Sequence, residues 1–204
     1  MSSASERADP RVLWNHNLQF HGWILGHMPH PCESALDVGC GDGVLTRKLA
    51  ERAAHVTGID AAPDMVALAK ERHAAENISY VTGDIVSYPW HTDSFDFIAA
   101  VAVIHHMPLA AVLERMAALL RRGGVLAVVG LARNTTLADH AFSAASVPLS
   151  RLVRMRTGYW DSPAPRLEPE ETFVEIRRLA RRTLPGVDVR RRLFFRYTLL
   201  WRRP

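Results

Sequence analysis

Cysteine and lysine are scarce in this chain, and long apolar runs are missing. Only two of the 204 residues are cysteines, Cys32 and Cys40, and neither has a partner at metal-ligand spacing. We expect both to be reduced and structural. No apolar run reaches the roughly 18 residues that a membrane-spanning helix needs, and Met1–Arg7 lacks the basic and then apolar pattern of a signal peptide. These absences predict a cytoplasmic protein with no metal site and no membrane partner.

Positive charge comes almost entirely from arginine, because Lys48 and Lys70 are the only lysines. Residues 151–204 carry fourteen arginines against six acidic residues, whereas residues 1–150 carry eleven basic against fifteen acidic residues. A basic tail can bind nucleic acid or an anionic surface. Here the arginines fall at helix-face spacing or alternate along a strand, and no recognised nucleic-acid motif accompanies them. We therefore expect a solvated face and no nucleic-acid partner.

Composition and patterning favour a single α/β domain. The hydrophobic fraction of 48% is enough for a large core in a chain of this length. Extended and helical patterns alternate, which is typical of a parallel sheet covered on both faces. Strands are expected at 35–39, 55–59, 78–81, 95–101 and 125–131, and helices at 11–27, 43–53, 63–75, 109–122 and 170–183. Two further extended runs, 187–195 and 197–201, predict an antiparallel pair that ends the sheet.

A glycine-rich turn follows the first expected strand. It has the form Asp37-x-Gly39-x-Gly41-x-Gly43 and leads directly into a helix. Glycine is needed where the backbone takes unusual dihedral angles or lies against a ligand. A dinucleotide fingerprint would place its third glycine at position 44, where Val44 stands. The spacing therefore favours a nucleoside-binding turn that differs from the nicotinamide dinucleotide motif.

This turn resembles the first motif of the class I S-adenosylmethionine-dependent methyltransferases. Further motifs of that family follow in the same order, namely Ile59–Met65, Val81–Ile85, Phe95–Val101 and Leu120–Leu126. The resemblance is tight over residues 34–131 and looser elsewhere. It implies a Rossmann-like, three-layer αβα sandwich with a seven-stranded, mostly parallel sheet, a reversed last strand and the strand order 3-2-1-4-5-7-6.

The resemblance also implies how one domain, residues 1–204, is organised. Residues 11–27 are expected to form an N-terminal lid helix, and residues 34–131 the cofactor-binding core. Residues 135–168 contain Phe142, Tyr159 and Trp160 and are expected to be an insertion on the acceptor side, since long insertions are commonly functional. Residues 170–204 are expected to supply the last helix and the antiparallel strand pair.

The same resemblance implies a site for S-adenosylmethionine. Asp60 ends the second strand and suits the ribose diol, because a carboxylate can accept from both hydroxyls. Asp84 would accept from the adenine amino group, and Gly39 and Gly41 would present backbone groups to the ammonium and carboxylate of the methionine part. Capping of the following turn remains an alternative role for Asp60 and Asp84. The full expected set is Asp37, Gly39, Cys40, Gly41, Gly43, Asp60, Ala61, Met65, Asp84, Ile85 and Val101.

The catalytic residues are less constrained by the sequence. A sulfonium methyl group is already activated, so transfer depends mainly on positioning and desolvation. A base is needed only where the acceptor loses a proton. His105 and His106 follow the fourth strand and titrate in a suitable range. They are candidates for this base, and a structural role in the loop over the cofactor is the alternative.

The N-terminal segment offers a second cluster. Trp14, Asn17 and His21 fall three and four residues apart and so share one face of the expected helix. In the class I methyltransferases that this chain resembles, an N-terminal helix often covers the cofactor. The resemblance therefore makes the three residues candidates for a lid or for contact with substrate. Simple packing of the helix against the protein body is the alternative.

The stretch after the fourth strand bears on the acceptor. Ala102–His105 lacks the Asn/Asp-Pro-Pro-aromatic run of related enzymes that methylate nucleobase amino groups. A small organic acceptor is therefore the favoured prediction, methylated at oxygen, nitrogen or carbon. An RNA or protein methyltransferase that uses the arginine-rich C-terminal part is one alternative. A non-catalytic domain that only binds the cofactor is another, since fold alone does not decide function. The sequence leaves the oligomeric state open.

Overall fold

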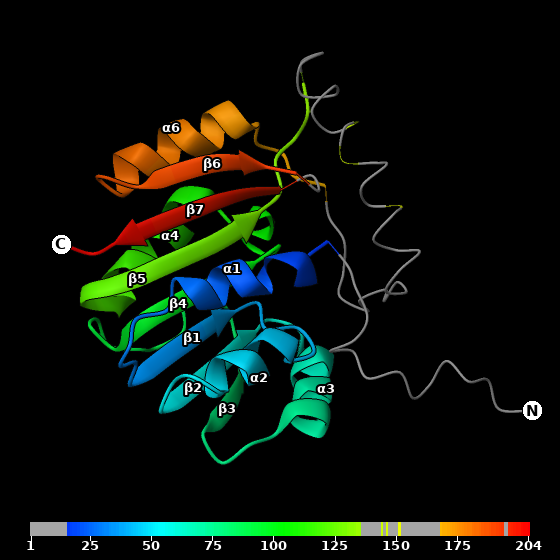
Figure 1. The fold of residues 1–204 in the computed structure, drawn as a ribbon, viewed down its shortest axis with the longest axis vertical. Coiled ribbons are helices and arrows are strands. Elements are labelled where there is room, and N and C mark those ends of the chain that lie inside the picture. Colours follow the sequence, from blue (N-terminus) through cyan, green and yellow to red (C-terminus); the bar gives the residue numbers. More distant parts are fainter. Residues whose placement is uncertain (1–15, 136–143, 145, 147–150, 152–167, 194–195) are drawn as a thin grey trace, which may run out of the picture.

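A seven-stranded sheet forms the middle layer of the computed structural model, which describes residues 16–135, 144, 146, 151, 168–193 and 196–204. Its strands are β1 (Ser34–Val38), β2 (His55–Asp60), β3 (Ile78–Thr82), β4 (Phe95–Val101), β5 (Leu120–Gly130), β6 (Asp188–Arg192) and β7 (Arg196–Arg202). The order is β3-β2-β1-β4-β5-β7-β6, and β7 runs antiparallel to both β5 and β6. The predicted topology, including the reversed last strand, is confirmed (Figure 1).

Helices cover both faces of this sheet. They are η2 (Leu18–Phe20), α1 (His21–Gly26), α2 (Val44–Ala50), α3 (Pro63–His73), η3 (Ile104–His106), α4 (Leu109–Leu119) and α6 (Phe173–Thr183). α1 and α2 pack on one face, and α4 and α6 pack on the other. Pro63 opens α3 at the first helical position, where its missing amide costs no hydrogen bond. Thr172 caps α6 in a capping box with Glu175.

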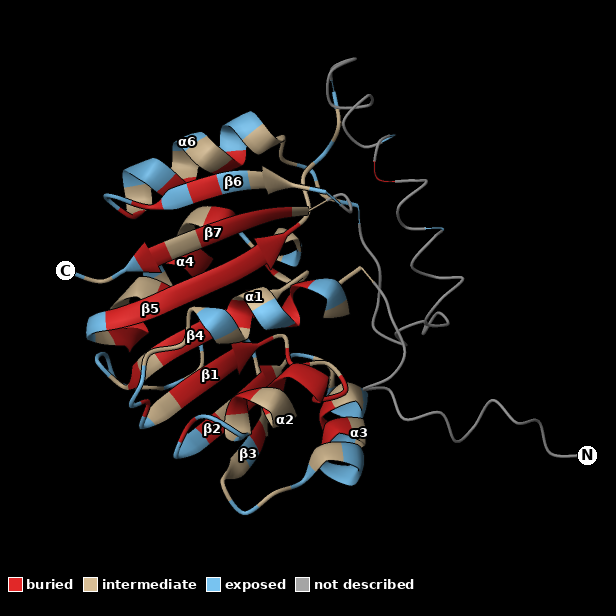
Figure 2. Cartoon of the chain, in the orientation of Figure 1, coloured by how far each residue is buried: buried red, intermediate tan, exposed pale blue. Residues whose placement is uncertain are grey.

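The sheet divides the core into two apolar clusters because alternate residues of a strand point to opposite faces. On the first face, Phe97 and Ala99 of β4 pack with Ile24 of α1 and Leu49 of α2. On the second face, Ile98 and Ala100 lie in the cluster that holds Leu113 and Met116 of α4. Figure 2 shows the central strands buried almost along their full length. The central strands of the sheet are therefore held in place by close packing on both faces.

Several helix boundaries differ from the sequence-based expectation. The helix expected over 43–53 is Val44–Ala50, that over 63–75 ends at His73, and that over 170–183 begins at Phe173. The N-terminal helix was expected over 11–27, but in the described part it is the short pair η2 and α1, while residues 11–15 lie outside the described residues. The helix expected to end at Arg122 ends at Leu119, and β5 begins at Leu120, which pairs with Phe95. Leu119 and Leu120 are both fully buried, so the chain turns into the sheet at this apolar pair.

The early start of β5 also brings Arg121 to Asp96. Both carboxylate oxygens of Asp96 accept from Nη1 of Arg121 at 2.9 Å. Oδ2 of Asp96 also accepts from the backbone amides of Glu33 at 3.0 Å and Ser34 at 2.9 Å. Partial burial favours the neutral acid, but the bonds from Arg121 and these two amides outweigh it, and the pKa of Asp96 is lowered. This cluster joins β1, β4 and β5 at the edge opposite the pocket.

No helix within the described ranges combines the length and the apolarity that crossing a bilayer demands.

We predict that Asp96→Asn lowers the free energy of unfolding at pH 7 by about 1–2 kcal/mol, because charge-assisted bonds to half-exposed partners are lost. The wild-type contribution is present above the unfolded pKa of about 3.9 and disappears as the pH falls through the lower folded value. Urea unfolding at pH 7 and at pH 3 measures both effects. Glu33→Gln is the control on an exposed neighbouring carboxylate. An equal loss of stability in both variants would contradict the assignment.

Candidate functional site

A pocket of about 440 Å³ opens at the carboxyl ends of the central strands. It lies where the strand order reverses between β1 and β4, which is the usual ligand position in open α/β sheets. Its walls come from the glycine loop, the ends of β2, β3 and β4, the η3 turn and the N-terminal segment. The lining residues are Asn17, Val38, Gly39, Gly41, Ile59, Asp60, Ala61, Ala62, Gly83, Asp84, Ile85, Val101, Ala102, Val103, His106 and Met107.

The glycine loop between β1 and α2 needs its glycines for two reasons. Gly39, Gly41 and Gly43 have φ angles of +66°, +53° and +86°, in the region that side chains disfavour. A Cβ on Gly39 would overlap the side chain of Val103, which packs over the loop from the end of β4. A Cβ on Gly41 would meet no atom within 4 Å, so this backbone lies bare at the pocket wall. The predicted backbone requirement is confirmed.

The amide groups of this loop donate to the protein itself. The amides of Gly39 and Cys40 both donate to the carbonyl oxygen of Ile59, at 2.8 and 3.0 Å. The amide of Gly43 donates to the Cys40 carbonyl oxygen at 2.9 Å, and the amide of Gly41 donates to Oδ2 of Asp60 at 2.9 Å. The loop was expected to present backbone groups to both ends of an amino acid. In the structure these four donors are engaged within the protein, and contact of the loop with the amino acid part of a ligand stays a prediction.

Asp60 and Asp84 each cap a turn and line the pocket. Oδ1 of Asp60 accepts from the amide of Ala62, and Oδ1 of Asp84 accepts from the amide of Val86, each at 2.9 Å. Both carboxylates therefore cap the turn that follows their strand. Both residues also line the pocket. Because each carboxylate oxygen can accept more than one hydrogen bond, capping does not prevent contact with a ligand.

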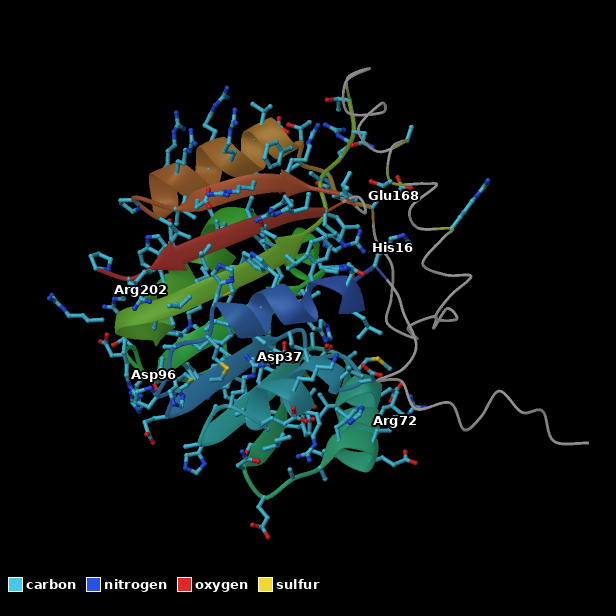
Figure 3. All side chains as sticks on the ribbon, in the orientation of Figure 1. His16, Asp37, Arg72, Asp96, Glu168 and Arg202 are labelled. Carbon is cyan, nitrogen blue, oxygen red and sulfur yellow. The ribbon has the colours of Figure 1, made fainter. Side chains whose placement is uncertain are left out.

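Asp37 belongs to β1 and is labelled in Figure 3. It does not line the pocket. Its side chain is 2% exposed, and Oδ2 accepts from Oγ1 of Thr46 at 2.7 Å. Burial raises the pKa of Asp37 to about 7, although the Thr46 hydroxyl opposes the shift, and the nearby charges of Asp60 and Asp42 raise the value further. Asp37 thus ties β1 to α2 and places a titratable acid below the ligand site.

Three further residues of the expected cofactor set stand behind the pocket wall. Cys40, Gly43 and Met65 do not line it. Cys40 packs with Val66, Ala69 and Tyr80, and burial raises the pKa of its thiol. The position where a Cβ of Gly43 would stand is 2.5 Å from Oη of Tyr80. Cys40 and Gly43 therefore support the loop from the α3 side.

The two histidines after β4 differ in their position relative to the pocket. His106 lines the pocket, whereas His105 does not. Their rings lie side by side, with centroids 4.1 Å apart. Partial burial lowers the pKa of His106, while the negative charge of Asp60 acts in the opposite direction. His106 is therefore mainly neutral at pH 7 and can accept a proton.

Of the three residues predicted to share a face of the N-terminal helix, Asn17 is the one that the structure places at the pocket. Asn17 lines the pocket, and Trp14 lies outside the described residues. His21 is not among the lining residues, since it is 5% exposed and packs towards α2. Burial and the neighbouring charge of Lys48 lower the pKa of His21 to about 3, and Nζ of Lys48 lies 3.3 Å from its Nδ1.

Sequence reasoning missed several residues of the wall. Ala102 has a φ of +54°, unusual for a residue with a side chain, and its amide donates to the Val129 carbonyl oxygen at 2.7 Å. This turn directs Val103 over Gly39 and brings Met107 to the pocket. No sequence pattern marks Ala102, because alanine carries no signal for a left-handed turn. Its position directly after β4 is the only hint.

Comparisons with known proteins agree with this geometry. Residues 35–124 match the family model described as a methyltransferase domain. An uncharacterized methyltransferase of Mycobacterium tuberculosis is 31% identical over 193 residues, which cover 94% of this chain and 98% of that protein. A ubiquinone biosynthesis O-methyltransferase of Xylella fastidiosa is 36% identical over 141 residues, covering 65% of this chain and 54% of that protein.

Solved structures show the same fold at lower identity. YcgJ of Bacillus subtilis superposes with a TM-score of 0.65 at 20% identity and covers 85% of this chain and 70% of its own. The N-methyltransferase NodS of Bradyrhizobium japonicum, solved with S-adenosylhomocysteine, gives a TM-score of 0.62 at 18% identity and covers 93% and 88%. Together with the near full-length relative and the glycine-loop pocket, these matches show that the chain belongs to the class I S-adenosylmethionine-dependent methyltransferases.

Proposed function

We propose that this methyltransferase acts on a small organic acceptor, with the pocket holding both the cofactor and the reacting end of the acceptor. The observation that carries the proposal is the composition of this one pocket. Its wall runs from Asp60, Asp84 and Ile85 past the bare backbone of Gly41 to Val103 and His106. The residues fit S-adenosylmethionine, which supplies an activated methyl group when it is bound.

The pocket offers a different chemical environment to each part of the cofactor. Asp84 and the backbone at Ile85 would bind the edge of the adenine, and Asp60 would accept from the ribose hydroxyls. The glycine loop and Val101 would lie beside the methionine part. These groups are held by the sheet, so they position the reacting atom and cost little ordering on binding.

The acceptor is proposed to enter beside Val103, His106 and Met107, at the end of the pocket formed by β4 and η3. His106 is mainly neutral at pH 7 and lines this end, so it is the better placed of the two histidines to take a proton from the acceptor. The apolar neighbours exclude water from the reacting atoms. The contribution of residues 135–168 to the acceptor site stays a prediction, because most of them lie outside the described residues. The cytoplasmic location also stays a prediction.

The arginine-rich C-terminal part gives little support to a polynucleotide substrate. Arg192 donates to the Thr198 hydroxyl, Arg196 to the Asn17 carboxamide and Arg202 to the Gly123 carbonyl oxygen. These arginines form hydrogen bonds within the chain. The exposed arginines of α6 fit a solvated helix face.

Asp60→Asn is expected to weaken both S-adenosylmethionine and S-adenosylhomocysteine by about tenfold to a hundredfold, since hydrogen bonds to a charged group are lost. Calorimetric titration measures the change. Asp64→Asn, on the exposed first turn of α3, is the control and should bind as the wild type does. Binding of a nicotinamide dinucleotide by the wild type, with no binding of either sulfur ligand, would refute the proposal.

Asp37→Asn should increase stability and weaken cofactor binding. Because the folded pKa of Asp37 is raised to about 7, the wild type loses stability as the pH rises from about 4 through 7. The advantage of the variant in thermal midpoint should therefore be larger at pH 8 than at pH 5. The variant should also discriminate less between cationic S-adenosylmethionine and neutral S-adenosylhomocysteine at pH 8. A pH-independent difference in midpoint would show that Asp37 does not ionise in this range.

His106→Gln should lower kcat by about a hundredfold for an acceptor that loses a proton, the scale of general base catalysis. Because the pKa of His106 is lowered, the wild-type rate should rise with pH on the acid side of the ordinary histidine range and then level off, and this limb should vanish in the variant. His105→Gln is the matched control. A panel of phenols, carboxylic acids and amines, assayed by formation of S-adenosylhomocysteine, tests transfer itself. Cofactor binding without transfer to any member would favour the non-catalytic alternative.

A further inference from the structure

The pocket has no obvious partner for the carboxylate of the cofactor. The four glycine-loop amides donate to Ile59, Cys40 and Asp60. The acidic residues in the wall are Asp60 and Asp84, and the wall as described contains neither lysine nor arginine. An unpaired carboxylate beside two other carboxylates would be costly to bind. These contacts direct the search for a donor to side chains elsewhere in the wall.

Asn17 lines the pocket, and its side chain is hydrogen bonded to the guanidinium group of Arg196. Its Oδ1 accepts from Nη2 of Arg196 at 2.7 Å and from Nε at 3.2 Å. A guanidinium group can only donate, so the carboxamide atom that faces it must be the oxygen. This contact sets the orientation of the side chain and leaves the NH2 group at the opposite end of the carboxamide. The carbonyl oxygen of Asn17 accepts from the amide of Phe20 at 3.0 Å, which fixes the backbone at the start of η2.

The sheet places this pair at the methionine end of the pocket. Asp60 and Asp84 mark the ribose and adenine end, at β2 and β3. Arg196 begins β7, and its neighbour Tyr197 pairs with Gly130 at the carboxyl end of β5. In the sheet order, β1 and β4 lie between these two groups. Figure 3 labels His16, the residue before Asn17, at the same end of the molecule.

We propose that the Asn17 carboxamide donates to the carboxylate of the methionine part of the cofactor and that Arg196 is its positioning residue. Arg196 holds the carboxamide oxygen, which aims the NH2 group into the pocket. The positive charge of Arg196 also polarises the carboxamide and strengthens its donation. The proposal rests on the proposed function, because it assigns a residue to the cofactor of that reaction. It links the N-terminal segment and the last strand, 179 residues apart in sequence, through one ligand contact.

The test compares two ligands that differ at this carboxylate. S-adenosylhomocysteine carries the amino acid part, whereas 5′-methylthioadenosine lacks it. Asn17→Asp keeps an oxygen for Arg196 but replaces the donor with a negative charge. We expect calorimetry to show S-adenosylhomocysteine binding weakened at least tenfold, the scale of one hydrogen bond to a charged group, with 5′-methylthioadenosine unchanged within about twofold.

The positioning role of Arg196 has its own readout. Arg196→Met should weaken S-adenosylhomocysteine but not 5′-methylthioadenosine, and Arg196→Lys should restore part of the loss. In an Asn17→Ala background, Arg196→Met should add little, because Arg196 acts through Asn17. Arg192→Met is the matched control. Arg192 lies on β6, where it pairs with Arg196 of β7, and it donates to the Thr198 hydroxyl. The control variant should bind both ligands as the wild type does.

The outcomes separate this inference from the proposed function. If the wild type binds neither ligand, the proposed function fails and the inference with it. If the wild type binds both and Asn17→Asp leaves their ratio unchanged, the inference fails while the function stands. Equal weakening of both ligands, with a lowered thermal midpoint, would assign the Asn17–Arg196 pair a purely structural role. Additive losses in the double variant would show that Arg196 does not act through Asn17, which would overturn its positioning role.

Discussion

The hydrogen bonds between the glycine loop and the end of β2 are the constraint on which the site depends. The Ile59 carbonyl oxygen accepts from two successive amides, and the Asp60 carboxylate accepts from a third. Since Val38 pairs with Ile59 in the sheet, the loop is built directly on two packed strands. The left-handed turns at Gly39 and Gly41 follow from these bonds. The loop is therefore shaped by folding, and a ligand meets a surface that needs little ordering.

The same bonds decide what the pocket can still offer. Four amides of the loop are engaged within the protein, and the acidic residues around the loop favour positive charge. Asp37 adds to this bias from below, where burial holds its pKa near 7 and the Thr46 hydroxyl limits the shift. A cofactor with a sulfonium, an ammonium and a carboxylate suits such a site only if something outside the loop receives the carboxylate. Asn17 brings the N-terminal segment to the wall of this acidic pocket.

The strands and the glycine turn could be predicted because their signals are local. Alternating patterns and the Asp37–Gly43 spacing depend on neighbouring residues, and the conformations predicted for Gly39, Gly41 and Gly43 are confirmed. The sheet order, which the family resemblance implied, is confirmed as well. The end of α4 was misplaced because Leu119 and Leu120 suit a helix equally well, and the bond from Arg121 to Asp96 is a tertiary contact. The face shared by Asn17 and His21 was predicted for one long helix. In the short η2–α1 pair, Asn17 reaches the pocket and His21 packs on Lys48.

The arginine excess of the C-terminal part shows how a composition signal can have an internal cause. Arg203 donates to the carbonyl oxygens of Leu120 and Ala118, and Arg202 donates to that of Gly123, so both secure the last strand against β5. A guanidinium group carries five N–H donors in a rigid, planar arrangement, so one arginine can bond to several carbonyl oxygens. The ammonium group of lysine does not offer this geometry. Some of the arginines of the C-terminal part thus serve hydrogen bonding in β7 and its neighbours. The bond from Arg196 to Asn17 extends the same principle to the pocket, where a residue of the last strand orients a side chain of the wall.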